Sequence, residues 1–188
     1  MRAMALLIVD MQHGMRTPAA GSRNNPDAES VMTSLLSHWR KIGEPVIHVR
    51  HISRTPGSLF WPGQAGVEFQ APLAPLDSEH VVEKNVPDAF INTGLERWLC
   101  ARSIESVVIV GVSTNNAVEA TARTCGNLGF KTYVIADATF AFAKHDFDGI
   151  LRSAQEVHAM ALANLHGEYA TVLTAQQLHR ALEDGERL

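Results

Sequence analysis

The feature that most constrains the fold is an alternation of short apolar runs with longer segments of helical period. The runs are rich in β-branched residues and apolar throughout, as expected for strands covered on both faces in a parallel sheet. They are Met4–Val9, Pro45–Val49, His80–Val82, Ser106–Val110, Lys131–Ala136 and Ala170–Leu173. Strands that alternate with helices favour right-handed βαβ crossovers. The sequence therefore predicts an α/β fold of three α/β/α layers around a doubly wound, six-stranded parallel sheet.

The segments between the runs carry helix-start signals, which support this Rossmann-like arrangement. The residues expected at helix starts are Asn25, Thr93, Thr114, Asp146 and Thr174. Asn25 precedes a proline, and Thr174 begins a capping box with Gln177. Asp146 would open a long helix, with Ile150 and Leu151 on its buried stripe.

Size and charge narrow the classes of protein that the chain can belong to. Its 188 residues suit one domain spanning 1–188. The composition, with 46% apolar and 19% charged residues, excludes intrinsic disorder. A net charge of −4 argues against a nucleic-acid partner, and the apolar runs are too short to span a bilayer. Two cysteines cannot form a disulfide framework, which indicates a reducing compartment. We therefore expect a soluble, cytoplasmic protein without nucleic-acid or membrane partners.

Reactive side chains follow three of the predicted strands. Asp10 comes directly after the first, Lys84 follows the third, and the segment 111–118 opens a helix after the fourth. Ligands of a doubly wound sheet bind beyond the carboxyl ends of its strands, where the strand order reverses. Each group also has a plain structural alternative, as a turn residue, a surface charge or a cap. Their joint placement predicts a site at this edge and identifies no reaction by itself.

Six motifs, in order along the chain, resemble those of the isochorismatase-like hydrolases, the cysteine hydrolase superfamily that includes the nicotinamidases. They are LLIVDMQ (Leu6–Gln12), PVIHVRH (Pro45–His51), EKNVPDAFINTGLERWL (Glu83–Leu99), VIVGVSTNNAVEATAR (Val108–Arg123), GNLGFKTYVIADA (Gly126–Ala138) and HAMALANLHGEYATV (His158–Val172). The resemblance covers nearly the whole chain. It implies a hydrolase that acts on a small molecule without a cofactor.

The resemblance also implies a catalytic triad of Asp, Lys and Cys. Asp10 matches the residue that takes the thiol proton and later delivers it to the leaving group. Lys84 matches the residue that lowers the thiol pKa. The position of the nucleophilic Cys is held by Ala117. Cys125 lies eight residues further along a helix, about 12 Å away, and is too distant to replace it.

A second implied feature is a cis peptide bond between Val112 and Ser113. In this family such a bond aims backbone N–H groups, including that of Ala117, at the substrate oxygen. Both cysteines of this chain, Cys100 and Cys125, are expected to be small buried helix residues.

The alanine leaves three functions open, because a methyl group cannot attack a carbonyl. Ala117 has two explanations. It either replaces a nucleophile that was removed to trap a substrate, or it is the natural residue. Natural absence of the nucleophile resembles the true isochorismatases, which cleave a vinyl ether by protonation from the Asp. The leading hypothesis is a hydrolase that in its cysteine-bearing form cleaves a C–N (amide-like) bond of a small molecule. The alternatives are hydrolysis of a vinyl ether through Asp10 without a nucleophile, and a binding protein that retains the pocket without catalysis.

The metal site of nicotinamidase-like members is not expected here. Those proteins carry an Asp-x-His pair after the second strand, where this chain has Val49-Arg50-His51. His48 lies inside the strand, where packing or hydrogen bonding is the simpler role. We therefore predict no metal.

The segment Ser53–Leu76, with four prolines and three glycines, is expected to form a wall of the pocket. Trp61 on this segment could stack on a planar substrate, or pack the loop or a subunit interface. The family match places Phe90 and Asn116 near the site. Because an apolar stretch at 59–61 is costly to expose, and because the family usually forms homo-oligomers, we expect a homo-oligomer.

Overall fold

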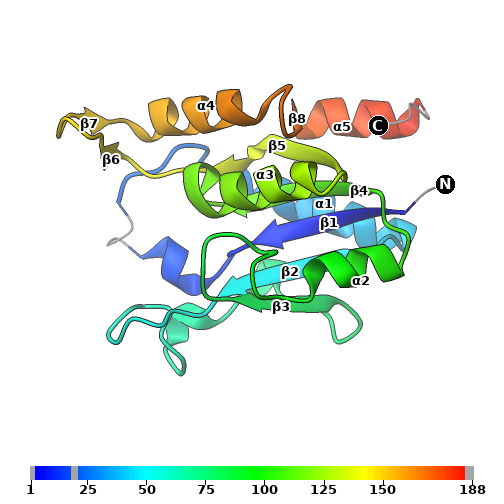
Figure 1. Cartoon of the computed structure of the whole chain (residues 1–188), viewed down its shortest axis with the longest axis horizontal. Coiled ribbons are helices and arrows are strands. Elements are labelled where there is room, and N and C mark those ends of the chain that lie inside the picture. Colours follow the sequence, from blue (N-terminus) through cyan, green and yellow to red (C-terminus); the bar gives the residue numbers. More distant parts are fainter. Residues whose placement is uncertain (1–2, 18–20, 185–188) are drawn as a thin grey trace.

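The computed structural model describes residues 3–17 and 21–184 and contains a six-stranded parallel sheet at its centre (Figure 1). The strands are β1 (Met4–Val9), β2 (Val46–His51), β3 (His80–Lys84), β4 (Ser106–Val112), β5 (Lys131–Phe140) and β8 (Thr171–Leu173). Their order is β3-β2-β1-β4-β5-β8, so the chain runs outward from β1 in one direction and from β4 in the other. The predicted doubly wound sheet is confirmed, and its switch point lies between β1 and β4.

Helices cover both faces of the sheet. Helices α1 (Ala28–Ile42) and α5 (Ala175–Glu183) pack on one face, and α2 (Leu95–Ala101), α3 (Glu119–Asn127) and α4 (Ala154–Leu165) on the other. Short 3-10 turns lie at His13–Arg16, Ala65–Val67 and Ala71–Leu73. Among the described residues, no helix has the length and apolar character needed to cross a bilayer.

Strand β1 shows why the strands appear in the sequence as unbroken runs of apolar residues. Leu6 and Ile8 pack in the cluster with α1, whereas Leu7 and Val9 pack in the cluster with α2 and α3. All four side chains are buried. A strand buried on both faces has no position that favours a polar residue.

The helix-start predictions are only partly right. The capping box of α5 is confirmed, because the Thr174 side chain accepts from the Gln177 N–H. Neither Thr93 nor Thr114 is an N-cap: Thr93 Oγ1 donates to a backbone carbonyl, and Thr114 lies inside a π-turn. Asn25 stands two residues before the N-cap of α1, and its amide bridges carbonyls of β5.

The prediction that Asp146 begins a long helix is wrong. Helix α4 begins at Ala154, because Ser153 and Glu156 form a reciprocal capping box. Asp146 instead lies in an antiparallel hairpin of β6 (Lys144–His145) and β7 (Leu151–Arg152). Ile150 and Leu151 are consequently exposed rather than buried.

Gly111 is required where β4 passes β1. Its φ is +122°, and a Cβ added there would lie 2.1 Å from the carbonyl oxygen of Val9. We expect Gly111→Ala to lower the free energy of unfolding by about 2–5 kcal/mol, because backbone strain and overlap both contribute. Urea unfolding measures the change.

The control for this replacement is Gly129→Ala. Gly129 has a φ of +89° but nothing within 4 Å of an added Cβ. Its replacement should therefore cost only the backbone strain, about 1 kcal/mol. Equal losses in the two variants would contradict the importance of the close approach to Val9.

Candidate active site

The centre of the candidate site is a buried ion pair at the carboxyl edge of the sheet. Asp10 directly follows β1, Lys84 ends β3, and the Asp10 Oδ2 lies 2.6 Å from the Lys84 Nζ. The exposed fractions of the two residues are 2% and 3%. The Asp10 N–H donates to the Val49 carbonyl of β2, the strand that lies between them. Three neighbouring strands therefore fix the geometry of the pair.

The second carboxylate oxygen of Asp10, Oδ1, differs from Oδ2 in its surroundings. Oδ1 is buried and has no hydrogen-bond partner among the described residues. Burial raises the pKa of Asp10 to about 6, because loss of water disfavours the charged form, while the charge and hydrogen bond of Lys84 oppose that shift. A carboxyl group that titrates near neutral pH and has a free oxygen is suited to giving or taking a proton.

The turn after β4 lies beside this pair. The peptide bond between Val112 and Ser113 is cis, and the π-turn Thr114–Val118 follows it and leads into α3. Val9 and Gly111 are register partners, so Asp10 and Val112 occupy equivalent places on adjacent strands. Ala117 is buried in the same apolar cluster as Val9. The methyl group of Ala117 therefore faces protein rather than open solvent.

The turn is held by a side chain to which sequence analysis assigned no role. His158 of α4 places its Nδ1 2.8 Å from the Thr114 Oγ1, and both residues are buried. Burial lowers the pKa of His158, which favours the neutral imidazole. The available signal was a histidine among the alanines and leucine of the buried face of α4, since a buried polar group requires a partner.

Gln12 attaches the segment after β2 to the end of β1. Its Oε1 accepts from the His51 N–H, and its Nε2 donates to the carbonyls of His51 and Val67. Because Gln12 is fully buried, these bonds fix the start of the segment that was predicted to wall the pocket. In the sequence, Gln12 is only the last residue of the LLIVDMQ motif, and nothing there predicts these contacts.

The three residues predicted to bind substrate lie in different environments. Phe90 is buried in the same cluster as Ala117 and stacks on Phe130, with ring centroids 6.3 Å apart. Trp61 and Asn116 are exposed, and neither belongs to a buried apolar cluster. Phe90 is therefore buried in the cluster that contains Ala117. Asn116 lies in the turn itself but is exposed, and Trp61 is exposed on the segment after β2.

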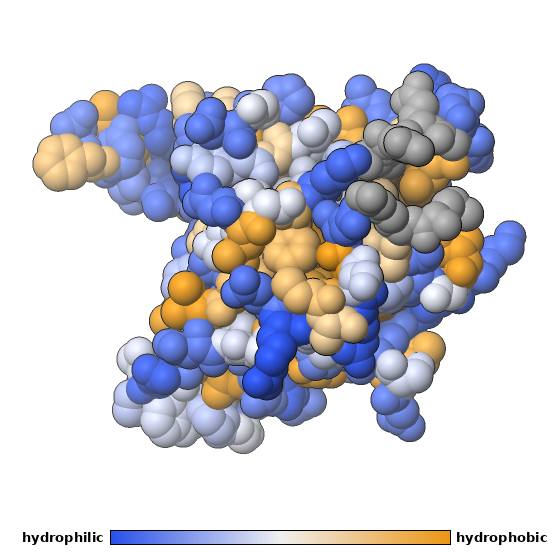
Figure 2. All heavy atoms as spheres, turned by 45° about the vertical axis from the view of Figure 1, so that its right-hand side comes forward, coloured by the Kyte–Doolittle hydropathy of each residue, from blue (hydrophilic) through white to orange (hydrophobic). Residues whose placement is uncertain are grey.

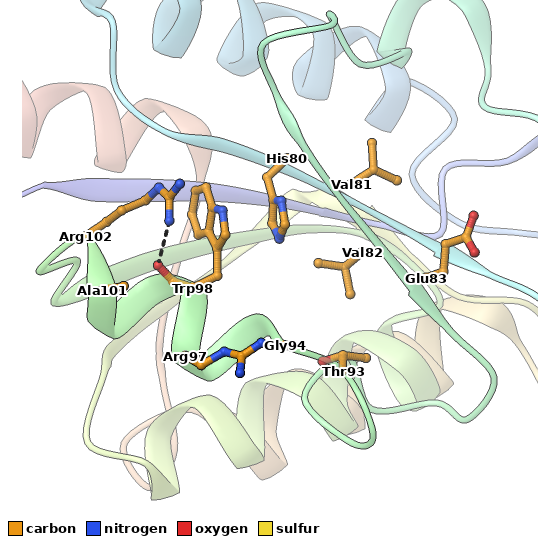
Figure 3. Close-up of a pocket in the computed structure, with 10 residues that line it drawn as sticks. All are labelled: His80, Val81, Val82, Glu83, Thr93, Gly94, Arg97, Trp98, Ala101 and Arg102. Carbon is orange, nitrogen blue, oxygen red and sulfur yellow. Dashed lines mark hydrogen bonds between the residues drawn. The ribbon is translucent and has the colours of Figure 1, made fainter.

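A cavity of about 460 Å³ lies between β3 and α2 (Figure 3). In its wall the rings of His80 and Trp98 stack, with centroids 4.4 Å apart, and Arg102 lies over the indole. Neither Asp10 nor Lys84 lines it. This hollow is therefore separate from the ion pair.

The cysteines and histidines provide no alternative centre. Burial raises the pKa of Cys125 to about 12, so its thiol stays protonated, whereas Cys100 is exposed, contrary to expectation. The His48 Nε2 lies 2.9 Å from the Glu79 Oε2. Within residues 3–17 and 21–184, no group of three or more His, Cys, Asp or Glu side chains is arranged to hold a metal ion.

The fold is that of the doubly wound α/β proteins, which bind ligands at this edge of the sheet. The isochorismatase domain matches residues 4–177. The isochorismatase-family protein YrdC of Bacillus subtilis (strain 168) is 42% identical over 174 residues, covering 93% of each chain. A crystal structure of an isochorismatase-family protein from Chromobacterium violaceum matches with a TM-score of 0.95 and 45% identity, over 98% of this chain and 95% of that one. The chain therefore belongs to the isochorismatase family.

One similar protein carries an activity in its name. Streptothricin hydrolase of Streptomyces noursei is 34% identical over 137 residues, which cover 71% of this chain and 48% of that enzyme. The family thus includes named hydrolases.

Lys84→Met tests the dependence of Asp10 on its partner. We expect a loss of about 3–5 kcal/mol in the free energy of unfolding at pH 8, because a buried carboxylate is left without its cation. The loss should be smaller at pH 5. Without Lys84 the folded-state pKa of Asp10 rises further above its ordinary value of 3.8, so the folded protein keeps a proton that the unfolded chain releases. Stability therefore falls as the pH rises.

Urea unfolding at both pH values measures this effect. The matched control is Asp10→Leu/Lys84→Met, which removes both charges and should recover most of the stability with little dependence on pH. Equal losses at pH 5 and pH 8 in the single variant would contradict the assigned coupling.

Proposed function

We propose that the chain is a hydrolase of small organic molecules in which Asp10 moves the proton and water, rather than an enzyme thiol, is the nucleophile. The observation that carries the proposal is the buried Asp10 carboxyl group, which is paired with Lys84 through one oxygen and free at the other. The methyl group at Ala117 argues against a covalent intermediate. The two unpaired cysteines suit a reducing, cytoplasmic compartment.

The reaction that suits these groups best is hydrolysis of a vinyl ether. The protonated Asp10 carboxyl group gives its proton to the terminal carbon of the double bond, which leaves a cationic carbon beside the ether oxygen. Water adds to that carbon and returns a proton to Asp10. The resulting hemiketal separates into a carbonyl compound and an alcohol. Lys84 holds the Asp10 carboxylate while the substrate carries positive charge.

A second candidate reaction is the cleavage of a C–N (amide-like) bond by an enzyme thiol. It is considered because the other residues that this mechanism uses are present, and only the cysteine is missing. Asp10, Lys84 and the cis turn at Val112–Ser113 are the features that cysteine hydrolases use to cleave a C–N (amide-like) bond. With a cysteine at position 117, Asp10 would take the thiol proton. Backbone N–H groups of the turn, including that of residue 117, would hold the oxyanion, each worth about 3 kcal/mol.

Ala117→Cys tests the second reaction directly. We expect hydrolysis of a panel of small amides to rise by roughly 10³-fold or more, because the missing nucleophile is restored beside its proton acceptor. Steady-state kinetics on the panel measures the gain. The matched control, Ala117→Cys/Asp10→Asn, should lose it. An unreplaced chain that hydrolyses amides at an ordinary enzymatic rate would exclude the thiol mechanism here.

The pH dependence separates the two reactions. With Asp10 at a pKa of about 6, kcat/KM of the unreplaced chain on vinyl ethers should fall about tenfold per pH unit above pH 6, because the acid form is required. In Ala117→Cys, kcat/KM on amides should instead rise to a plateau through the same range, because the carboxylate is required. Profiles from pH 4.5 to 8.5 measure both limbs. A chain that binds vinyl ethers and amides without converting either would be a binding protein.

A further inference from the structure

The cavity between β3 and α2 has the size and the lining of a small-molecule site. It lies beside the edge strand of the sheet, at the lower side of Figure 1, and its volume is about 460 Å³. Ligand cavities in proteins typically measure about 300–1,000 Å³. Figure 2 shows this side of the molecule, where hydrophobic and hydrophilic side chains lie in small neighbouring areas. Neither Asp10 nor Lys84 lines the cavity, so the chemistry proposed above does not account for it.

One wall of the cavity is a row of three flat groups. The His80 and Trp98 rings are nearly parallel, with an angle of 6° between their planes. The Arg102 Cζ lies 4.1 Å from the centre of the indole ring, and its Nη1 donates to the Trp98 carbonyl. In Figure 3 the indole stands between Arg102 and His80, which leaves the second face of the imidazole ring for another flat group. Because the protein's own contacts order this row, a ligand would lose little affinity to ordering it.

The surface beside the row is apolar and roomy. His80 and Val82 are two residues apart on β3, so their side chains lie on the same face of the strand. Gly94 lines the opposite side, and a Cβ added there would meet only the Arg97 Nη2, at 3.9 Å. The missing side chain of Gly94 therefore leaves space between the helix and the strand. A flat apolar ligand is suited to this space.

The charged groups of the lining favour an anion. Arg97 has no hydrogen-bond or ion-pair partner in the described part of the chain. The one carboxylate of the lining, Glu83, accepts a hydrogen bond of 2.9 Å from the Arg50 Nε, which offsets its charge. Burial and the charge of Arg102 lower the pKa of His80, which favours a neutral ring. The lining therefore carries an excess of positive charge.

We propose that this cavity binds a small aromatic carboxylate. The ligand ring packs on the His80 ring and Val82, and the ligand carboxylate accepts two hydrogen bonds from the Arg97 guanidinium. The planar fork of guanidinium N–H groups matches the geometry of a carboxylate, and a charged pair of this kind is stronger than a neutral one. An aromatic ring also stacks favourably on another flat ring. The site is independent of the reaction that takes place at Asp10.

Calorimetric titration of the full chain with benzoate tests the proposal. We expect a dissociation constant of about 1 mM or lower. Acetate, which lacks the ring, and benzyl alcohol, which lacks the charge, should each bind at least about tenfold more weakly. No benzoate binding at about 10 mM, or equal binding of benzyl alcohol, would overturn the proposal. The row of flat groups would then serve only to pack α2 on the sheet.

Replacements in the cavity wall test the assigned contacts. Arg97→Gln should raise the dissociation constant of benzoate about tenfold or more, because the cation is lost. The matched control, Arg180→Gln, removes an exposed charge on α5 and should bind benzoate like the unreplaced chain. Gly94→Leu should abolish binding by filling the cavity, whereas Gly94→Ala adds only a methyl group without close contacts and should retain it. Unchanged affinity in Arg97→Gln or in Gly94→Leu would overturn the proposal.

The three tryptophans report where benzoate binds. Trp98 lies in the wall of the cavity, Trp61 lies on the segment after β2, and Trp39 is buried on the other face of the sheet. In NMR spectra of the full chain, benzoate should shift the indole N–H signal of Trp98 and leave the other two in place. A shift of Trp61 without one of Trp98 would place benzoate at the candidate active site and overturn the proposal.

Discussion

The buried contact between Asp10 and Lys84 is the interaction on which the site depends. Taking two charges out of water is costly, and their attraction repays that cost only with good geometry. Here three parallel strands supply the geometry, because Asp10 follows β1, Lys84 ends β3 and β2 holds the backbone of Asp10 between them. The pair is stable only in the completed sheet. The ion pair therefore depends on the folded sheet for its geometry, and it contributes little to the stability of that sheet.

The balance within the pair sets what Asp10 can do. Lys84 alone would keep the carboxyl group ionised, whereas burial alone would keep it protonated. Together they place the pKa of Asp10 at about 6, where both forms are accessible. In the two proposed reactions the same carboxyl group serves as an acid beside Ala117 or as a base beside a cysteine. On that proposal, residue 117 decides which of the two protonation states is useful.

Much of this arrangement could be predicted from the sequence. The six apolar runs predict the sheet because parallel strands buried on both faces leave a signal that needs no tertiary information. Asp10 and Lys84 could be placed at one edge because both follow strand ends. The roles of Gln12 and His158 could not, because each depends on a partner distant in sequence, such as Thr114 for His158. The start of α4 was missed because Asp146 and Ser153 are both capable caps, and only Glu156 decides between them.

The segment between β2 and β3 divides the pair in the chain, with Asp10 before it and Lys84 after it. A chain cut within this segment would carry the two charges on separate fragments, which meet along the pairing of β2 with β3 and of β1 with β4. Neither fragment could hold its charge in a dry interior alone. Re-formation of the contact between Asp10 and Lys84 would therefore report that the two fragments have associated. This makes the segment between β2 and β3 a suitable place to split the protein into two complementing fragments.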